Sequence, residues 1–302
     1  MATHIGDMTG KHVLITGGNS GIGRETAAEL ARLGANVAIT SRDAARGREA
    51  AAEILSRTGR TVDVIGLDLA SLASVRSAAR AYLGRFDRLD VLINNAGGIL
   101  SRRSLTPEGF EATFCGNYLG HFLFTSLLIE SLRATAPARI VMVSSDAHRF
   151  ARSLDFSDLQ LAGRYGTWRA YSRSKLAVIL FTRELARRLQ GTGVTANSLH
   201  PGIIASGFGQ DGDVSGAWGL FVRLTRPLRP LLISPAEGAR TILFLATSPE
   251  VAHVSGEYFV KSRVATPSPA ARDDAAARRL WEVSEALVAG SDQSAKVSDP
   301  EI

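Results

Sequence analysis

Short apolar runs alternate with amphipathic stretches along most of the chain. The runs, which are rich in aliphatic residues, lie at 11–16, 36–40, 61–67, 90–93, 138–143 and 193–199. The stretches between them place apolar residues at helical spacing and lie at 24–33, 44–57, 71–85, 107–134 and 170–189. Strands that are apolar throughout are typical of a parallel sheet covered on both faces. The alternation therefore predicts an α/β fold, a doubly wound parallel sheet in a single domain.

The composition of the chain changes after the sixth predicted strand. Residues 203–233 are rich in glycine, proline and large apolar side chains, which we interpret as a mobile lid with short helices. The elements predicted after it are a helix over 235–246, an edge strand over 256–260 and an amphipathic helix over 272–287. From Gly290 we expect disorder. Residues 1–262 are thus predicted to form one domain that includes the lid, and residues 263–302 a C-terminal helix and tail.

Composition and charge exclude several classes of protein. The chain has 302 residues, of which 45% are hydrophobic and 21% charged, as in an ordinary soluble globular protein. The net charge of +6 comes from arginines scattered along predicted helices, which favours a solvated surface over nucleic-acid binding. The six histidines show no metal-ligand spacing with one another or with the single Cys115, so no metal site is predicted.

The same sequence gives expectations about location. One cysteine excludes an internal disulfide framework and suits a reducing compartment. The N-terminal residues 1–12 contain no apolar run, so we predict no signal peptide and no anchor. No stretch approaches the roughly 18 unbroken apolar residues that a membrane span needs. We expect a cytoplasmic protein without a membrane span.

A glycine-rich turn follows the first strand and opens the first helix. In a doubly wound sheet, ligands bind beyond the carboxyl ends of the strands. Backbone amides of such a turn, with the helix N-terminus, can contact a pyrophosphate. The turn predicts a Rossmann-type dinucleotide site whose residues are Gly17, Asn19, Ser20, Gly21, Ile22 and Gly23.

The end of the second strand favours NADP(H) over NAD(H). An acidic residue there would bind the ribose 2′-hydroxyl, whereas an arginine accommodates a 2′-phosphate. This chain has Arg42 after Ser41. Asp43 comes next, and its more natural role is to cap the following helix.

Other polar clusters also fall at strand ends. Candidate cofactor contacts there are Asp68, Leu69, Asn95, Ala96, Gly97, Pro201, Gly202 and Ile204. Each has a plainer interpretation: Asp68 could cap its turn, and residues 94–97 could be an ordinary turn. Ser145 follows the fifth strand, and its hydroxyl could hold a substrate oxygen or serve only as a turn residue.

Tyr171 and Lys175 are four residues apart on a predicted helix, so their side chains share one face. A lysine cation beside a tyrosine favours the phenolate and lowers the tyrosine pKa toward neutrality. The pair therefore predicts an acid/base catalyst, with an ordinary amphipathic helix as the alternative. Asn117 lies in an otherwise apolar helix and needs buried partners, either structural or functional.

Taken together, these residues resemble the short-chain dehydrogenase/reductase family over about residues 8–262. The shared motifs, in family order, are Thr16-Gly17-x-x-x-Gly21-Ile22-Gly23, Asn94-Asn95-Ala96-Gly97, Ser145, Tyr171-x-x-x-Lys175 and Pro201-Gly202. The chain is most similar to the retinol-dehydrogenase-like branch. The stretches that carry this closer similarity are 67–72, 117–122, 158–160, 174–177 and 181–189.

The resemblance implies a catalytic tetrad of Asn117, Ser145, Tyr171 and Lys175. Tyr171 would exchange a proton with the substrate oxygen while NADP(H) exchanges hydride, and Ser145 would hold that oxygen. Lys175 would bind the nicotinamide ribose and lower the Tyr171 pKa. Asn117 would hold a water that links Lys175 to solvent. The family also implies a homodimer or homotetramer that pairs through the helices at 107–134 and 171–189.

Two functions follow. The first is an NADP(H)-dependent oxidoreductase that interconverts a carbonyl and an alcohol on an apolar or aromatic small molecule. Its apolar preference rests on lid residues, namely Phe208, Trp218, Phe221 and Leu224. Those residues could equally pack the lid or an oligomer contact. The second is a non-catalytic NADP-binding sensor or scaffold on the same fold. Substrate, pathway, direction and stereochemistry are not encoded in any motif of the chain.

Overall fold

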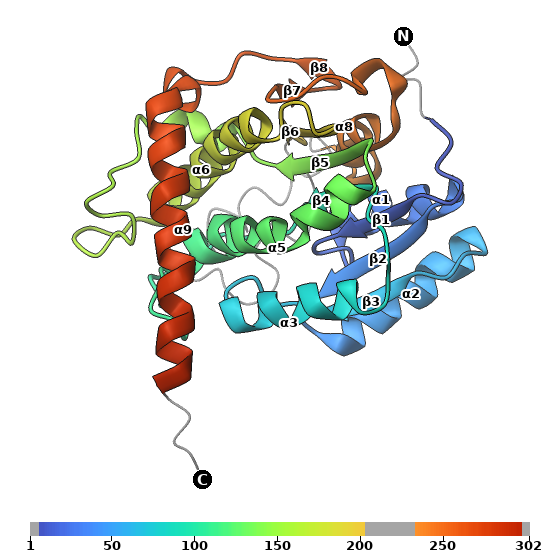
Figure 1. Ribbon diagram of the computed structural model, residues 1–302, viewed down its shortest axis with the longest axis horizontal. Helices are drawn as coiled ribbons and strands as arrows, with labels where there is room; N and C mark the ends of the chain where they lie inside the picture. Colours follow the sequence, from blue (N-terminus) through green and yellow to red (C-terminus); the bar gives the residue numbers. More distant parts are fainter. Residues whose placement is uncertain (1–5, 203–232, 298–302) are drawn as a thin grey trace.

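The computed structural model describes residues 6–202 and 233–297, with side chains up to Ser291. Its sheet has the strand order β3-β2-β1-β4-β5-β6-β7-β8 (Figure 1). The strands are β1 His12–Ile15, β2 Asn36–Ser41, β3 Asp63–Gly66, β4 Val91–Asn94, β5 Ala138–Val143, β6 Val194–His200, β7 Tyr258–Val260 and β8 Arg263–Val264. All neighbours pair in parallel except β7 and β8. The order reverses between β1 and β4, which places the ligand-binding crevice of this fold there.

Helices cover both faces of the sheet, as the doubly wound prediction requires. The main ones are α1 Gly21–Arg32, α2 Ala44–Thr58, α3 Leu72–Leu83, α5 Gly120–Ala134, α6 Thr167–Arg188, α8 Pro235–Thr247 and α9 Asp274–Val297. Alternate strand residues enter separate cores. Val13 and Ile15 pack with α1, α2 and α8, whereas Leu14 packs with α3, α5 and α6. The predicted α/β fold is confirmed.

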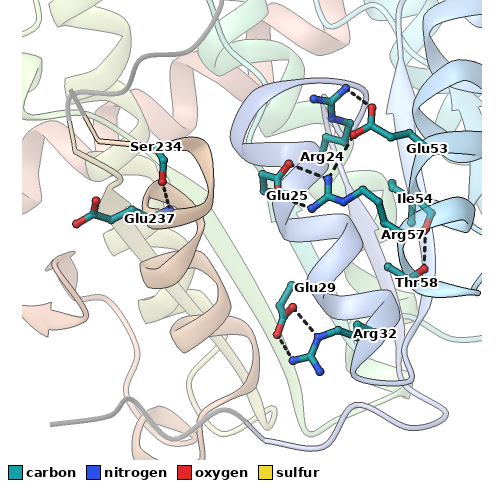
Figure 2. Close-up of polar contacts among 10 residues, drawn as sticks. All are labelled: Arg24, Glu25, Glu29, Arg32, Glu53, Ile54, Arg57, Thr58, Ser234 and Glu237. Carbon is teal, nitrogen blue, oxygen red and sulfur yellow. Dashed lines mark hydrogen bonds and ion pairs between the residues drawn. The ribbon is translucent and has the colours of Figure 1, made fainter. Parts of the chain in front are cut away.

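Helices α1 and α2 are tied together by ion pairs beside the glycine turn (Figure 2). Arg24 contacts Glu53 at 2.6 Å, and Arg57 contacts Glu25 at 2.7 Å. Such partly exposed pairs contribute about 0–1 kcal/mol each to stability. They link α1 to α2 and give Arg24 an acidic partner on the neighbouring helix.

The helix predicted over 107–134 is wrong at its start. Glu111 caps a short helix, α4 (Ala112–Phe114), through hydrogen bonds from the amides of Thr113 and Phe114. A π-helical turn over Cys115–Leu119 follows, before α5. Pro107 lies outside any helix, because Leu105 and Glu111 form an isolated β-bridge around it. The edge position predicted for 256–260 is also wrong, since β8 pairs outside β7.

The C-terminal helix is part of the main core. Trp281 of α9 contacts the rings of Phe122 on α5, at 5.2 Å between centroids, and of Phe181 on α6, at 5.7 Å. Figure 1 shows α9 lying across one end of α5 and α6. Subunit pairing through these two helices stays a prediction. Disorder from Gly290 is wrong as far as Val297, where α9 ends. The predicted lid lies almost wholly outside the described residues.

Replacing Trp281 by alanine should lower the free energy of unfolding by about 2–4 kcal/mol, because it empties the contact between α9 and both helices. The guanidinium of Arg188, 4.2 Å from the centre of the Trp281 ring, would lose this cation–π contact and keep its ion pair with Glu184. Urea unfolding measures the change. Glu282→Ala on the exposed side of α9 is the control, and we expect it to change stability by less than about 0.5 kcal/mol. Equal effects of the two variants would contradict this docking.

Candidate active site

The glycine turn between β1 and α1 is built so that only glycine fits. Gly17 has φ +67°, in the left-handed region. A Cβ on Gly23 would collide with the carbonyl oxygen of Gly17 and lie 2.6 Å from Nδ2 of Asn95. A Cβ on Gly18 would collide with the side chain of Ile39. The turn is thus packed tightly onto β2 and β4, which leaves its outer backbone surface open to a ligand.

The N-terminus of α1 offers unsatisfied amides to that ligand. Ser20 is the N-cap residue, but its side chain makes no capping hydrogen bond. The first helical residues are Gly21, Ile22 and Gly23, and the first turn contains no acidic side chain. Free amides and the positive end of the helix dipole bind phosphates. A nucleotide pyrophosphate fits this turn.

Asp43, after β2, caps the following helix as predicted, whereas the role predicted for Arg42 stays a prediction. Asp43 caps α2 by accepting from the amides of Ala45 at 2.8 Å and Arg46 at 3.1 Å. The hydroxyl of Ser41 donates to the Asp43 carbonyl at 2.6 Å. Arg42 is exposed and makes no ion pair within the described ranges. Its guanidinium therefore stands at the strand end where a 2′-phosphate would be bound.

Asp68 and Leu69 follow β3. Asp68 stabilises its own turn, and Leu69 contacts the residues that lead into α5. The Asp68 carboxylate accepts from the amide of Ala70 at 3.0 Å, which agrees with the turn-capping interpretation. Leu69 is buried, and its carbonyl accepts a weak hydrogen bond from Cys115 at 3.5 Å. A Cβ on Gly120 would collide with the same carbonyl. Adenine contact by these two residues stays a prediction.

Thr16, at the end of β1, organises the turn after β4. Its hydroxyl accepts from the amides of Asn95 at 2.9 Å and Ala96 at 3.0 Å. Asn95 in turn donates its side-chain amide to the Thr16 carbonyl at 2.9 Å. These bonds join β1 and β4 at the point where the strand order reverses. Residues 95–97 are therefore a fixed wall of the crevice rather than an ordinary turn.

His121 is a buried residue that sequence reasoning did not single out. Its Nδ1 donates to the carbonyl of Asn117 at 3.2 Å, so its Nε2 accepts from the Thr16 hydroxyl at 2.9 Å. The His121 pKa is lowered to about 3, mainly by burial and to a smaller extent by the nearby Lys175 cation, while the hydrogen bond to the Asn117 carbonyl opposes the shift. A histidine within an apolar helix, four residues after Asn117, was the available signal. His121 connects the nucleotide crevice to the π-helical turn.

Asn117 lies in that π-helical turn with its whole amide engaged. Its Nδ2 donates to the carbonyl of Gly98 at 2.8 Å and to the hydroxyl of Ser174 at 2.9 Å. Its Oδ1 accepts from the amide of Gly98 at 2.8 Å. The side chain thus has a structural role, bridging the turn after β4 to α6. A functional role for Asn117 stays a prediction.

Lys175 is buried on α6, and its Nζ lies close to Gly97 and Asn117. Its Nζ donates to the carbonyl of Val143 at 3.0 Å. A Cβ on Gly97 would lie 3.1 Å from that Nζ and 3.1 Å from Oδ1 of Asn117, so a larger residue there would crowd both side chains. Burial lowers the pKa of Lys175 to about 8. Burial therefore disfavours the charged form of Lys175, so that the side chain can release its proton near neutral pH.

Tyr171 lies one helical turn before Lys175, and the lysine Nζ is 5.7 Å from its ring centroid. The ring packs on Ile99 and Ala147. Burial raises the Tyr171 pKa to about 12, and a hydrogen bond with Ser145 opposes this rise. The expected lowering of the Tyr171 pKa by Lys175 is therefore wrong for the chain by itself, because desolvation exceeds any effect of the cation.

The two serines after β5 have different tasks. The hydroxyl of Ser144 is buried and donates to the carbonyl of Lys175 at 2.8 Å. The hydroxyl of Ser145 accepts from the amide of Ala147 at 3.2 Å and meets Tyr171. Pro201 and Gly202 follow β6 and are partly exposed, with Gly202 at φ +98°. Ile204 lies outside the described residues.

The arrangement joins a nucleotide cradle to a proton-transfer pair. Gly97 contacts the Asn117 and Lys175 side chains, while Ser145 and Tyr171 share a hydrogen bond at the next strand end.

Among residues 6–202 and 233–297, no group of three or more His, Cys, Asp and Glu could hold a metal ion. No helix in the same ranges could cross a bilayer.

Comparisons with known proteins agree over nearly the whole chain. A family model described as short chain dehydrogenase matches residues 11–213. Mouse retinol dehydrogenase 14 is 46% identical over 299 residues, which cover 94% of this chain and 87% of that protein. Human retinol dehydrogenase 13 is 44% identical over 281 residues, covering 92% and 85%.

Solved structures give the same picture. An uncharacterized protein from Mycobacterium paratuberculosis superposes with a TM-score of 0.76 at 34% identity, covering 96% of this chain and 97% of that one. The Pseudomonas aeruginosa RhlG/NADP active-site complex has a TM-score of 0.66 at 28% identity, covering 85% and 96%. The similarity extends over the whole sheet rather than over one motif.

Proposed function

We propose that this chain, which belongs to the short-chain dehydrogenase family and to its retinol-dehydrogenase-like branch, uses NADP(H) to interconvert an alcohol and a carbonyl on an apolar small molecule. Family membership makes it an oxidoreductase acting on an alcohol or carbonyl. The cofactor preference, the catalytic residues and the substrate class are the proposal. It rests above all on one observation: Ser145, Tyr171 and Lys175 converge beside the glycine cradle.

The residues present fit a nicotinamide nucleotide with a 2′-phosphate. Gly17 and Gly23 let the turn pack closely on Asn95 and Ala96, and α1 begins with uncapped amides that can bind a pyrophosphate. Arg42 would hold the 2′-phosphate by charge-assisted hydrogen bonds, which an acidic residue could not make. Lys175 would hold the nicotinamide ribose. The solved RhlG/NADP complex from Pseudomonas aeruginosa supports the preference.

Tyr171 is proposed as the general acid and base. The bound nucleotide supplies or accepts the hydride. In the reducing direction the Tyr171 hydroxyl, which is protonated below its pKa of about 12, donates its proton to the substrate oxygen. In the oxidising direction Tyr171 must lose that proton first. The Ser145 hydroxyl, already at hydrogen-bond contact with Tyr171, then holds the same substrate oxygen.

Lys175 is proposed to set the electrostatics of this proton transfer. Its ammonium would stabilise the negative charge that Tyr171 acquires as its proton leaves. A pKa of about 8 keeps Lys175 mostly charged at neutral pH but able to exchange a proton. The Asn117 carbonyl, which already accepts from His121, has a second lone pair on which a water could connect Lys175 to solvent.

An apolar substrate is favoured by a row of aromatic rings that ends at Tyr171. Phe150 contacts Trp168 at 5.5 Å between centroids, and Trp168 contacts Tyr171 at 5.8 Å. Phe150 is 68% exposed and Trp168 40% exposed, so both offer apolar surface beside the reactive hydroxyl. The relatives named as retinol dehydrogenases point to the same class of substrate.

Coenzyme oxidation tests the proposal directly. NADPH consumption is followed by its absorbance against a panel of apolar aldehydes, ketones and quinones, with NADH in parallel. Turnover of apolar carbonyls with NADPH is the expected result. Tight NADPH binding without turnover on any carbonyl or alcohol would instead favour the non-catalytic sensor.

Arg42→Asp should lower kcat/KM for NADPH by about 10–100-fold, since each charge-assisted hydrogen bond to a 2′-phosphate contributes about 1.5–3 kcal/mol. The same variant should keep or improve kcat/KM for NADH. Arg48→Asp, an exposed charge reversal on α2, controls for general electrostatics. A parallel loss with both coenzymes would show that Arg42 does not read the 2′-phosphate.

A further inference from the structure

His148 is a fully buried histidine outside the predicted tetrad, and both of its nitrogens have partners. Its Nδ1 lies 2.7 Å from the carbonyl oxygen of Ser145. Its Nε2 lies 3.1 Å from the backbone amide of Ser268, 120 residues further along the chain. The imidazole thus bridges the loop after β5 and the segment that leads into α9.

The partners of His148 fix its protonation. A carbonyl oxygen can only accept, so Nδ1 carries the proton. A backbone N–H can only donate, so Nε2 is unprotonated. Burial lowers the His148 pKa, which agrees with a neutral ring. The bridge therefore requires one tautomer, and no apolar side chain could replace it.

The bridge acts on the backbone of Ser145. The Ser145 carbonyl accepts both from Nδ1 of His148 and from the His148 amide at 3.1 Å. The Ser145 hydroxyl accepts a hydrogen bond from the amide of Ala147 and forms another with Tyr171. The carbonyl and the hydroxyl belong to one residue, the N-cap of a 3-10 helix, so a displacement of the Ser145 backbone moves both groups.

The same turn has two more links to residues near the C-terminus. Arg149 donates to the carbonyl of Thr266 at 2.9 Å. Tyr258 donates to the carboxylate of Asp146 at 3.1 Å, and its ring packs edge-on against His148 at 5.1 Å. The segment 263–272 is thus fastened to the turn that begins with Ser145.

We propose that His148 is a positioning residue that couples the C-terminal segment 263–272 to the hydroxyl of Ser145, so that this segment sets how the enzyme holds the substrate oxygen. The inference rests on the proposed function of Ser145. It assigns that segment, which lies outside the family match at 11–213, a role in turnover as well as in folding.

Ser268→Pro tests the coupling with a matched control. Ser268 has φ −60°, which suits the proline backbone. The substitution removes the N–H that His148 accepts, together with the hydroxyl, and directs the ring Cδ toward Nε2 of His148, so the hydrogen bond cannot form. Ser268→Ala removes only a hydroxyl that has no partner among the described residues. We expect kcat to fall about tenfold or more in the proline variant, because small displacements of positioned groups are costly in turnover. The alanine variant should stay within about twofold of the parent, and KM for NADPH should be unchanged in both.

A second variant separates positioning from simple destabilisation. His148→Asn keeps a donor for the Ser145 carbonyl but cannot reach Ser268. Combining it with Ser268→Pro should lower kcat no further than either change alone, since both remove one hydrogen bond. Three results would overturn the coupling. The first is additive loss of kcat in the double variant, and the second is an equal effect of proline and alanine at position 268. The third is a loss of kcat that parallels losses of thermal stability and NADPH binding.

A spectroscopic measurement keeps this test independent of the proposed function. Nitrogen–proton correlation spectra of the histidine rings distinguish Nδ1–H from Nε2–H. The parent should show His148 as Nδ1–H, and Ser268→Pro should shift its Nε2 signal while Ser268→Ala should not. If the parent turned over no substrate, the proposed function would fail, and these spectra would still decide the link. An unchanged Nε2 signal in the proline variant would refute it.

Discussion

Tyr171→Phe should lower kcat by about 10²–10⁴-fold while leaving NADPH binding within about twofold of the parent. The substitution removes one oxygen and keeps the ring, which packs on Ile99, Ala147 and Trp168. Loss of the hydroxyl removes the group that exchanges a proton with the substrate oxygen. Stopped-flow or steady-state NADPH oxidation gives kcat, and fluorescence titration gives the NADPH dissociation constant.

The chain provides a matched control for this substitution. The Tyr165 hydroxyl donates to the carbonyl of Leu100 at 3.0 Å, in the loop just before α6. Tyr165→Phe removes a similar hydroxyl close to the site but not at the reacting atoms, so we expect most activity to remain. If Tyr171→Phe kept full turnover, the proton would have to come from another group, and the proposed mechanism would be wrong.

Lys175→Met should lower kcat by at least about 10²-fold and should also weaken NADPH binding, since Lys175 serves both the Tyr171 charge and the nicotinamide ribose in the proposed mechanism. It should in addition change how stability depends on pH. The Lys175 pKa is about 8 in the folded chain and near 10.5 when the side chain is solvated. Between these values the unfolded chain holds a proton that the folded chain has lost.

The sign of the pH effect follows from that difference. Stability rises with pH wherever the unfolded state binds more protons, so the parent should gain roughly 2–4 kcal/mol from Lys175 between pH 8 and pH 10.5. The methionine variant should lack this gain. Urea unfolding of both proteins from pH 7 to pH 10 isolates it by difference, with Lys261→Met at an exposed position as the control. The same pH slope in parent and Lys175→Met would mean that Lys175 is not desolvated.

The local sequence pattern was enough to predict the sheet and the residues whose roles depend only on their own helix or strand. The strand interiors predicted a covered parallel sheet because side chains alternate between two apolar faces, as Leu14 and its neighbours Val13 and Ile15 do. Asp43 was expected to cap α2 because an N-cap needs only the next three amides. Tyr171 and Lys175 share a face because both lie on one helix.

The tertiary structure decided whatever depends on partners far along the chain. His121 bridges Thr16 across 105 positions, and His148 meets Ser268 across 120. No local period encodes such pairs, so neither histidine stood out from the sequence. The start of the helix before α5 moved from Pro107 to Ala112 for the same reason: a bridge between Leu105 and Glu111 competes with helix there.

Burial was the other property that only the tertiary structure determined. The charges around Tyr171 suggested a lowered pKa, but packing against Ile99 and Ala147 raises it to about 12. The contacts of Trp281 with Phe122 and Phe181 likewise depend on how α9 docks on α5 and α6. Sequence spacing reports which groups share an element. The desolvation of a group depends on everything packed around it, and that is settled only when the whole chain has folded.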